Sequence, residues 1–443
     1  MGQQPAEMGQ EKIAKLLLRM AAPSIITTLT TSLYSIADAA FIGRLGPDAL
    51  GAITVSFPIL AFIGCFGLMF GLGGSSALSR FLGSGETGKA DSAALIAVYG
   101  ALFFGTCAGV TAFLFIKPLL ILFGATRSIV PFAIPYGKIL SLGSAVTVCN
   151  MAFSYIVRGE GNTRYSMTAM AAGTAANIIL DPVLIFLCKM GIAGAAYATI
   201  ISQLFTLVLF IIYYKKDVKY ISIKRHRHIP LRPIIKETLK IGFPSFINQF
   251  FVSAVLAVIN NVAKTFSTES IGAVGIVIRI LFFGIFIIFG YCRALLPVAG
   301  YNYGASEFQR LREASKFSII VLSCFSLIFG IIMTAGAYSI LKFFSSDAVL
   351  IESGGRILRY AGLVFPFFGF EAVIMTLHQA LGKPYPAAVL SLARQGVLII
   401  PIALLLYPFL GVKGIVVSIF ISEVLILALS LFFGFRLKNQ LSR

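Results

Sequence analysis

The chain alternates between long apolar runs and short segments that are rich in Gly, Pro or charged residues. Each apolar run has more than 20 residues, and about 20 residues of helix are needed to cross the hydrocarbon core of a bilayer. The pattern therefore predicts twelve membrane-spanning helices, six on each side of a polar break. They are expected at 16–42, 51–78, 92–116, 129–155, 166–187, 192–214, 238–263, 271–299, 317–341, 354–377, 386–410 and 414–435.

The polar break at 215–240 holds nine Lys and Arg residues together with His226 and His228. Because arginines surround both histidines, we interpret them as part of a solvated linker and not as a metal-binding pair. The break divides the chain into an N-lobe at 1–214, a basic cytoplasmic linker at 215–236 and a C-lobe at 237–443.

Matching residues recur 221 positions apart between the two halves. Since each half has an even number of spans, both halves enter the membrane from the same side and form parallel repeats. We therefore expect an all-α polytopic membrane protein, in which two six-helix repeats face each other across a central cavity and alternate access by rocking. The recurring pairs include Leu18 and Leu239, Pro23 and Pro244, Ser24 and Ser245, Gly83 and Gly304, and Gly161 and Gly382.

Composition agrees with this class, because 58% of the residues are hydrophobic, only 12% are charged and the mean hydropathy is +0.93. The net charge of +19 comes mostly from the short connections, which is typical of orientation in a membrane and not of nucleic-acid binding. With both termini in the cytoplasm, 23 basic residues fall in cytoplasmic segments and 10 in external ones. A cell-membrane protein with both termini cytoplasmic is predicted, and the six cysteines are expected to be free thiols.

One motif resembles a phosphate-binding loop. Residues 83–90 fit its pattern up to the last place, where Ala90 stands instead of the Ser or Thr that would hold magnesium. The motif also follows a membrane span and not a strand, so we interpret it as a tight cytoplasmic turn. Without an ATP site, a pump must draw on an ion gradient.

Acidic and polar residues at membrane depth are the strongest candidates for function. A charged side chain there costs roughly 2.5–3.5 kcal/mol on insertion scales, so its presence needs a reason. Asn177 and Asp181 lie four residues apart on one helix face, and Asp38 and Thr199 are expected at a similar depth in the outer half of the N-lobe. Such an oxygen-rich pocket suits protons or hard cations such as Na⁺. The alternative is that these residues only hold spans one, five and six together.

The charges of the C-lobe spans lie at matching depths in pairs. Glu371 and Arg394 each lie within about nine residues of the inner end of a span, and Arg279 and Glu423 each lie within about nine residues of the outer end. We predict two structural ion pairs, with a substrate role for these residues as the equal alternative.

The repeat and three motifs resemble the multidrug and toxic compound extrusion (MATE) transporters over essentially the whole chain. The motifs are the segment 38–46 that closes span one, Asn177 to Pro182 in span five and Gly191 to Thr199 in span six. The resemblance implies efflux of lipophilic, often cationic compounds in exchange for protons or sodium, without another cofactor. It also implies an N-lobe cation-coupling site, with a proton or Na⁺ held by Asp38, Asn177, Asp181 and Thr199.

The same resemblance implies a small-molecule substrate, a lipid bilayer as surroundings and a monomer. Some family members also use acids in spans seven and ten; here span seven has none, and Glu371 is the sole acid of span ten. The alternatives are a flippase for lipid-linked saccharides, which is expected to have a cationic cavity, and a membrane enzyme, for which no convergent catalytic set is present. The substrate cavity is assigned to Tyr34, Asn150, Met151, Gln249 and Glu371.

Overall fold

The computed structural model describes residues 8–215, 221–263, 268–344, 348–398, 401–402, 405–406 and 412–441. All regular structure in these ranges is helical, as the apolar pattern predicts. The N-terminal half contains helices for the first six predicted spans. They are α2 (Ile13–Gly43), α3 (Pro47–Gly83), α4 (Thr87–Leu114), α5 (Ile116–Leu122), α6 (Val130–Leu142), α7 (Ser144–Gly159), α8 (Thr163–Pro182), the π-helical turn η1 (Val183–Leu187) and α9 (Gly191–Lys215).

The C-terminal half repeats this series. Nine helices among the described residues are long and apolar enough to cross a bilayer, and α6 with α7, bent by 51° at Gly143, makes a tenth. The other two predicted spans fall on α10 and on the stretch that begins with α14, which confirms an all-helical polytopic fold. The helices are α10 (Leu231–Ala263), α11 (Thr268–Gly304), α12 (Phe308–Phe344), α13 (Ala348–Ala380), α14 (Pro384–Leu392), η2 (Ala393–Val397) and α16 (Val412–Leu441).

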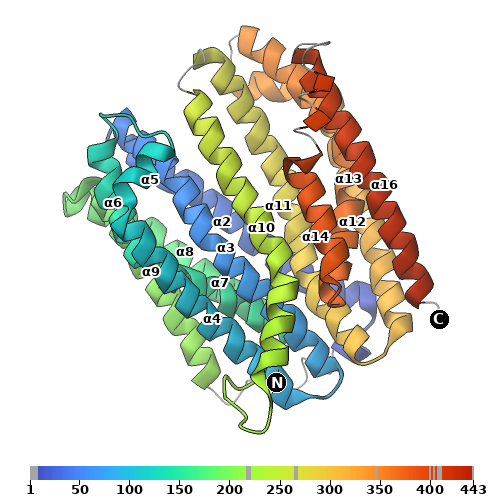
Figure 1. The fold of residues 1–443 in the computed structure, drawn as a ribbon. Coiled ribbons are helices and arrows are strands. Elements are labelled where there is room, and N and C mark those ends of the chain that lie inside the picture. Colours follow the sequence, from blue (N-terminus) through green and yellow to red (C-terminus); the bar gives the residue numbers. More distant parts are fainter. Residues whose placement is uncertain are drawn as a thin grey trace.

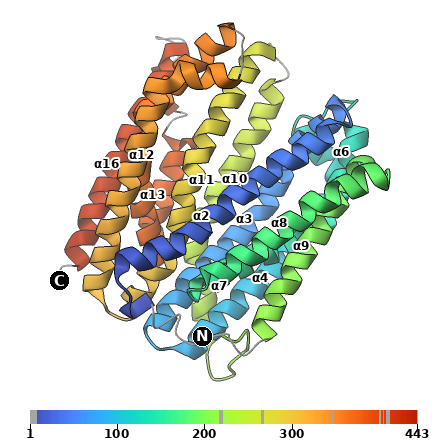
Figure 2. The same cartoon turned by 180° about the vertical axis from the view of Figure 1, so that it is seen from behind.

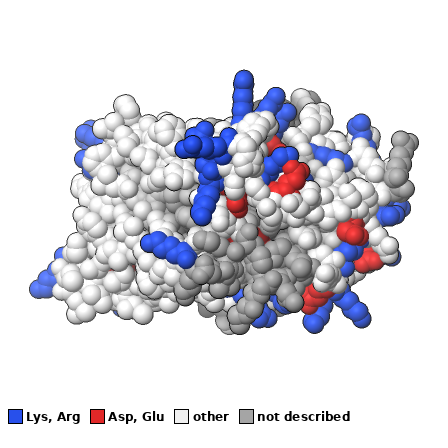
Figure 3. All heavy atoms as spheres, turned by 90° about the horizontal axis from the view of Figure 1, so that it is seen from below, with Lys and Arg blue, Asp and Glu red and all other residues white. Residues whose placement is uncertain are grey.

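The helices form two groups that approach each other at the lower end of the molecule and diverge toward the upper end, as Figure 1 and the reverse view in Figure 2 show. Three pairs of long helices contribute most of the contact between the groups. They are α3 with α10, α2 with α11, and α3 with α11. At the lower end, where α2 begins and α16 ends, Lys and Arg side chains gather on the surface (Figure 3).

At the lower end, the backbones of α3 and α11 touch through two glycines. A Cβ atom on Gly83 would lie 2.0 Å from the carbonyl oxygen of Tyr301, and one on Gly304 would lie 2.0 Å from that of Arg80. Both positions therefore require a residue without a side chain. Gly304 occupies the position equivalent to Gly83 in the internal repeat, and Tyr301 the position equivalent to Arg80. The two contacts are therefore equivalent to each other in the predicted repeat.

Arg80 extends this closure with polar contacts. Its Nη1 atom donates to the carbonyl oxygen of Ala380 at 2.8 Å and to the Ser76 hydroxyl at 2.6 Å, and its Nη2 atom pairs with Glu237 at 2.5 Å. Ser76 itself donates to the carbonyl oxygen of Gln379 at 2.6 Å. Since Arg80 and Ser76 belong to α3 while their partners belong to α10 and α13, these bonds hold the two halves together at the lower end.

Candidate functional site

The predicted cation site is built on α8, whose last residues carry Asn177 and Asp181 one helical turn apart. Both side chains are inside the protein, with 2% and 0% of their surfaces exposed. Pro182 ends the regular helix because it has no N–H to donate to the carbonyl four residues earlier, and the chain continues as the π-helical turn η1. Such turns are frequent at functional sites, because they break the regular bonding of the backbone.

Asn177 links the carboxylate to the next helix. In the amide orientation that satisfies both of its ends, the nitrogen donates to Asp181 Oδ2 at 3.0 Å and the oxygen accepts from the backbone N–H of Thr199 at 3.2 Å. The Thr199 hydroxyl donates to the carbonyl oxygen of Ala195 at 3.0 Å, which leaves its oxygen as an acceptor. The structure thus brings Asn177, Asp181 and Thr199 together.

Asp38 comes from α2, which packs against α8 and α9. Its side chain is 6% exposed, and its Oδ1 atom has no hydrogen-bond partner in the described part of the chain. Its charge interacts with that of Asp181. All four residues predicted from the N-lobe sequence therefore lie on three helices that pack together, and two of them are carboxylates that face the same poorly hydrated region.

No basic side chain of the described residues forms an ion pair with either carboxylate. Lys138, the nearest candidate from the sequence, lies over the ring of Phe113, with its Nζ atom 5.2 Å from the ring centre. Two carboxylates without a counter-charge, next to an amide and a hydroxyl, offer hard oxygen atoms to a proton or a sodium ion. The described residues contain no group of three or more His, Cys, Asp or Glu side chains that would suit a transition metal.

In the C-lobe, Arg394 contacts both glutamates. Its Nη1 atom donates to Glu371 Oε2 at 2.8 Å, its Nη2 atom lies 3.8 Å from Glu423 Oε1, and its guanidinium carbon is 3.5 Å from the centre of the Phe368 ring. The predicted pair of Arg279 with Glu423 is wrong. Glu423 turns toward Arg394 because α16 packs against α13 and η2, and Arg279 is exposed on α11.

The residues assigned to the substrate cavity are spread over both halves. Asn150 is buried in the N-lobe and donates to the carbonyl oxygen of Gln203 at 2.8 Å. Met151 packs against α3, where a Cβ on Gly67 would lie 2.7 Å from its sulfur. Gln249 is half-buried on α10, and the side chain of Tyr34 lies outside the described residues. These placements leave the cavity assignment as a prediction.

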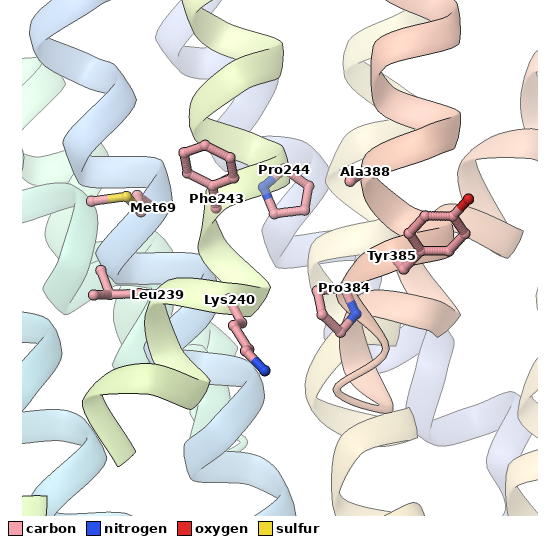
Figure 4. A pocket seen from close by; sticks show the side chains of 8 residues that line it. All are labelled: Met69, Leu239, Lys240, Phe243, Pro244, Pro384, Tyr385 and Ala388. Carbon is pink, nitrogen blue, oxygen red and sulfur yellow. The ribbon is translucent and has the colours of Figure 1, made fainter. Parts of the chain in front are cut away.

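A pocket of about 470 Å³ lies elsewhere, between α10 and the start of α14 (Figure 4). Its wall is apolar except for Lys240 and the hydroxyl of Tyr385. This composition does not suit a cation, so the pocket is not the site predicted from the acids. It is lined by Met69, Leu239, Lys240, Phe243, Pro244, Pro384, Tyr385 and Ala388.

Sequence reasoning missed several buried charged residues near the lower end. Arg80, Arg158 and Glu160 are all less than 9% exposed, although the apolar runs place all three in connections between spans. Helix α7 continues to Gly159, beyond the end of the run that predicts it. Their nearness to Gly83 and Gly161, which both take part in the internal repeat, is the one signal that could have marked this region as packed.

A protein-family model and curated proteins both match this chain over most of its length. The MatE family model matches residues 23–183 and again residues 244–405, so the two matches begin at Pro23 and Pro244, which are mates under the internal repeat. Among curated proteins, the multidrug export protein MepA of Staphylococcus haemolyticus is 27% identical over 435 residues, which cover 98% of this chain and 96% of that protein. MepA of Staphylococcus aureus is 26% identical, covering 97% and 95%.

Solved structures resemble the whole chain as well. A MATE protein crystallised in the bent conformation superposes with a TM-score of 0.91 at 26% identity, covering 99% of both chains. A multidrug resistance MATE family transporter in an outward-facing conformation gives 0.89 at 26% identity and 98% coverage of both. A transporter from Pyrococcus furiosus, described as having a binding pocket of reverse polarity, also gives 0.89 at 26%, covering 99% and 98%.

Proposed function

This chain belongs to the MatE family of multidrug efflux transporters, and we propose that it exports lipophilic, cationic compounds in exchange for protons or sodium ions. The family consists of transporters, so the predictions that the chain is a multi-pass membrane protein and not an enzyme are confirmed. The substrate is a small molecule, and the surroundings are a lipid bilayer. The exchange for an ion and the cationic substrate are the parts that we propose.

The observation that carries the proposal is the pair of buried carboxylates in the N-lobe. Asp38 has an oxygen without a partner among the described residues, and its charge interacts with that of Asp181. A cation that enters between them removes like-charge repulsion in a region of low dielectric constant, where that repulsion is strong. A proton, a sodium ion and a cationic substrate all carry the charge that this site lacks, so they compete for it.

Competition for one site becomes transport when binding also shifts the balance between two conformations. The polar contacts of Arg80, together with the close contacts of Gly83 with Tyr301 and of Gly304 with Arg80, close the lower end in this structure. We propose that export uses the reverse arrangement as its second state, with the lower end open and the substrate admitted from that side. The coupling ion then returns the protein to the state described here.

The coupling ion is testable with purified protein in liposomes that contain ethidium as a lipophilic cation. We expect ethidium movement to follow one imposed gradient, either of protons or of sodium, and to stop when that gradient is collapsed by an ionophore. Protein-free liposomes under the same gradient are the control. Ethidium movement at the control rate under both gradients would contradict ion-coupled export.

We further propose that the protein resides in the cell membrane as a monomer, with both termini and the linker in the cytoplasm. The support is the charge bias of the sequence and the gathering of Lys and Arg at the lower end (Figure 3). Cysteines introduced at Ser222 and Ser442, in a background without Cys107, Cys188 and Cys324, should both resist a membrane-impermeant maleimide in intact cells. Both should react in inverted vesicles. Labelling of the two positions from opposite sides would disprove this orientation.

A further inference from the structure

Arg158 lies at the end of α7, inside the protein, with 3% of its surface exposed. Its Nη1 atom donates to the Ser166 hydroxyl at 3.2 Å, while its Nε atom has no hydrogen-bond partner in the described part of the chain. The hydroxyl of Ser75, which lies beside neighbouring Gly159, also has none there. A donor without a partner on a buried cation costs free energy, because burial removes its hydrogen bonds to water and no protein atom replaces this one.

A second arginine approaches from the other half of the molecule. The guanidinium carbon of Arg293, on α11, is 5.7 Å from the centre of the Tyr155 ring, and that of Arg158 is 4.7 Å from the same ring centre. Because both guanidinium groups lie next to one ring, their like charges repel each other. The Nη1 atom of Arg293 also reaches the Thr28 hydroxyl at 3.4 Å. The lobes therefore meet here with two positive charges that share one aromatic ring.

No carboxylate of the described residues neutralises these arginines. The acid nearest to Arg158 in the sequence is Glu160, which accepts hydrogen bonds from the hydroxyls of Tyr213, at 3.3 Å, and Tyr214. Arg80 and Arg394, by contrast, each form an ion pair with a carboxylate.

The repeat shows that the fold does not require either charge. The C-lobe position equivalent to Arg158 holds Gln379, whose neutral amide donates to the Ser245 hydroxyl at 3.3 Å. The N-lobe position equivalent to Arg293 holds Leu72. At each of these two positions, the other lobe has an uncharged residue. The two arginines therefore come together only because the two repeats differ in sequence here.

We propose that Arg158 and Arg293 bind the oxyanion group of an amphipathic solute, such as a carboxylate or sulfonate, when it lies between the lobes. Guanidinium groups bind such anions through charge-assisted hydrogen bonds, and the free Nε donor of Arg158 is available for one of them. The anion would also remove the repulsion between the arginines, so its binding favours the closed lower end. This inference rests on the proposed transport function and extends it to substrates that carry a negative group.

The test is equilibrium binding to the purified full-length protein, measured by calorimetry without any ion gradient. Its failure is therefore distinguishable from a failure of ion-coupled export. The probes are 1-naphthoate and the neutral 1-naphthamide, which share one ring system and differ in charge. We expect the wild type to bind naphthoate at least tenfold more tightly than naphthamide. Equal affinity for naphthoate and naphthamide would overturn the proposal.

Variants then assign the binding to the two arginines. Arg158→Gln introduces the residue of the equivalent C-lobe position. The single variants Arg158→Gln and Arg293→Gln should each weaken naphthoate binding at least tenfold and leave naphthamide binding unchanged. Arg279→Gln, at an exposed arginine of α11, is the matched control and should bind as the wild type does. Arg158→Lys keeps the positive charge and should bind naphthoate more tightly than Arg158→Gln does. If Arg158→Gln folds poorly, Arg293→Gln and Arg158→Lys carry the test. Undiminished naphthoate binding in folded Arg293→Gln would overturn the proposal.

Discussion

Asp181→Asn is expected to abolish gradient-driven efflux of ethidium while leaving the amount of folded protein close to that of the wild type. Asn has nearly the shape of Asp, so the bond with Asn177 and the packing of α8 against α2 and α9 are largely kept. The change removes one of the two negative charges that interact across this site. Without that charge, Asp38 alone attracts a cation less strongly, and the difference in binding free energy that drives the conformational change is lost.

The neighbouring residues separate the two candidate ions. Asn177→Ala should reduce efflux, because Asp181 loses the donor that orients it. Thr199→Ala should reduce sodium-driven efflux several-fold, since sodium needs neutral oxygen ligands, but should change proton-driven efflux little. Asp48→Asn makes the same chemical change outside the site, at the start of α3, and is the control. All variants are compared in liposomes at equal amounts of monodisperse protein.

Two outcomes would defeat this account of Asp181. A folded Asp181→Asn protein that transports at the wild-type rate against a gradient would remove the carboxylate from the coupling mechanism. Unfolded or degraded Asp181→Asn protein, together with unfolded Asn177→Ala, would show instead that these residues only hold α8 to its neighbours. The second outcome is the helix-packing alternative that the sequence leaves open.

The N-lobe site was predictable because its signals are local. Asn177 and Asp181 are one turn apart, so the helical repeat alone places them on one face, and counting residues from the span ends places Asp38 and Thr199 near their level. Depth in the membrane predicts contacts less well for long side chains, because such a side chain can reach several neighbouring helices. Arg279 and Glu423 are at matched depths, yet the direction in which each helix faces separates them, and an apolar pattern alone does not fix that direction.

The lower end was harder to predict for a related reason. Where the lobes touch, charged residues such as Arg158 are buried by a helix from the other half of the chain, so the sequence around them still has the polarity of a connection. The contacts of Gly83 with Tyr301 and of Gly304 with Arg80 join backbone segments from opposite halves of the chain. Only the pairing of the lobes, which a single sequence does not contain, brings them together.

Arg394→Gln is expected to destabilise the protein more than any other single neutralisation in the C-lobe. Arg394 is the partner of Glu371, which is 3% exposed, and it also lies near Glu423. Its removal leaves two carboxylates facing each other among helices, and breaking a buried pair in this way costs about 3–5 kcal/mol. The midpoint of thermal unfolding in detergent and the yield of monodisperse protein should both fall clearly below those of the wild type.

The partners of Arg394 allow the structural role to be separated from a functional one. Glu371→Gln should cost less than Arg394→Gln, because Glu423 still lies 3.8 Å from the remaining guanidinium and shares its charge. The triple change of Glu371, Arg394 and Glu423 to Gln leaves no stranded charge and should recover much of the lost stability, since neutral replacement of a buried ion network is often close to neutral. Glu423→Gln is the matched control for loss of the longer contact alone. If Glu371→Gln protein is fully stable but transports nothing, the network serves substrate or ion binding, and the stability of the fold rests elsewhere.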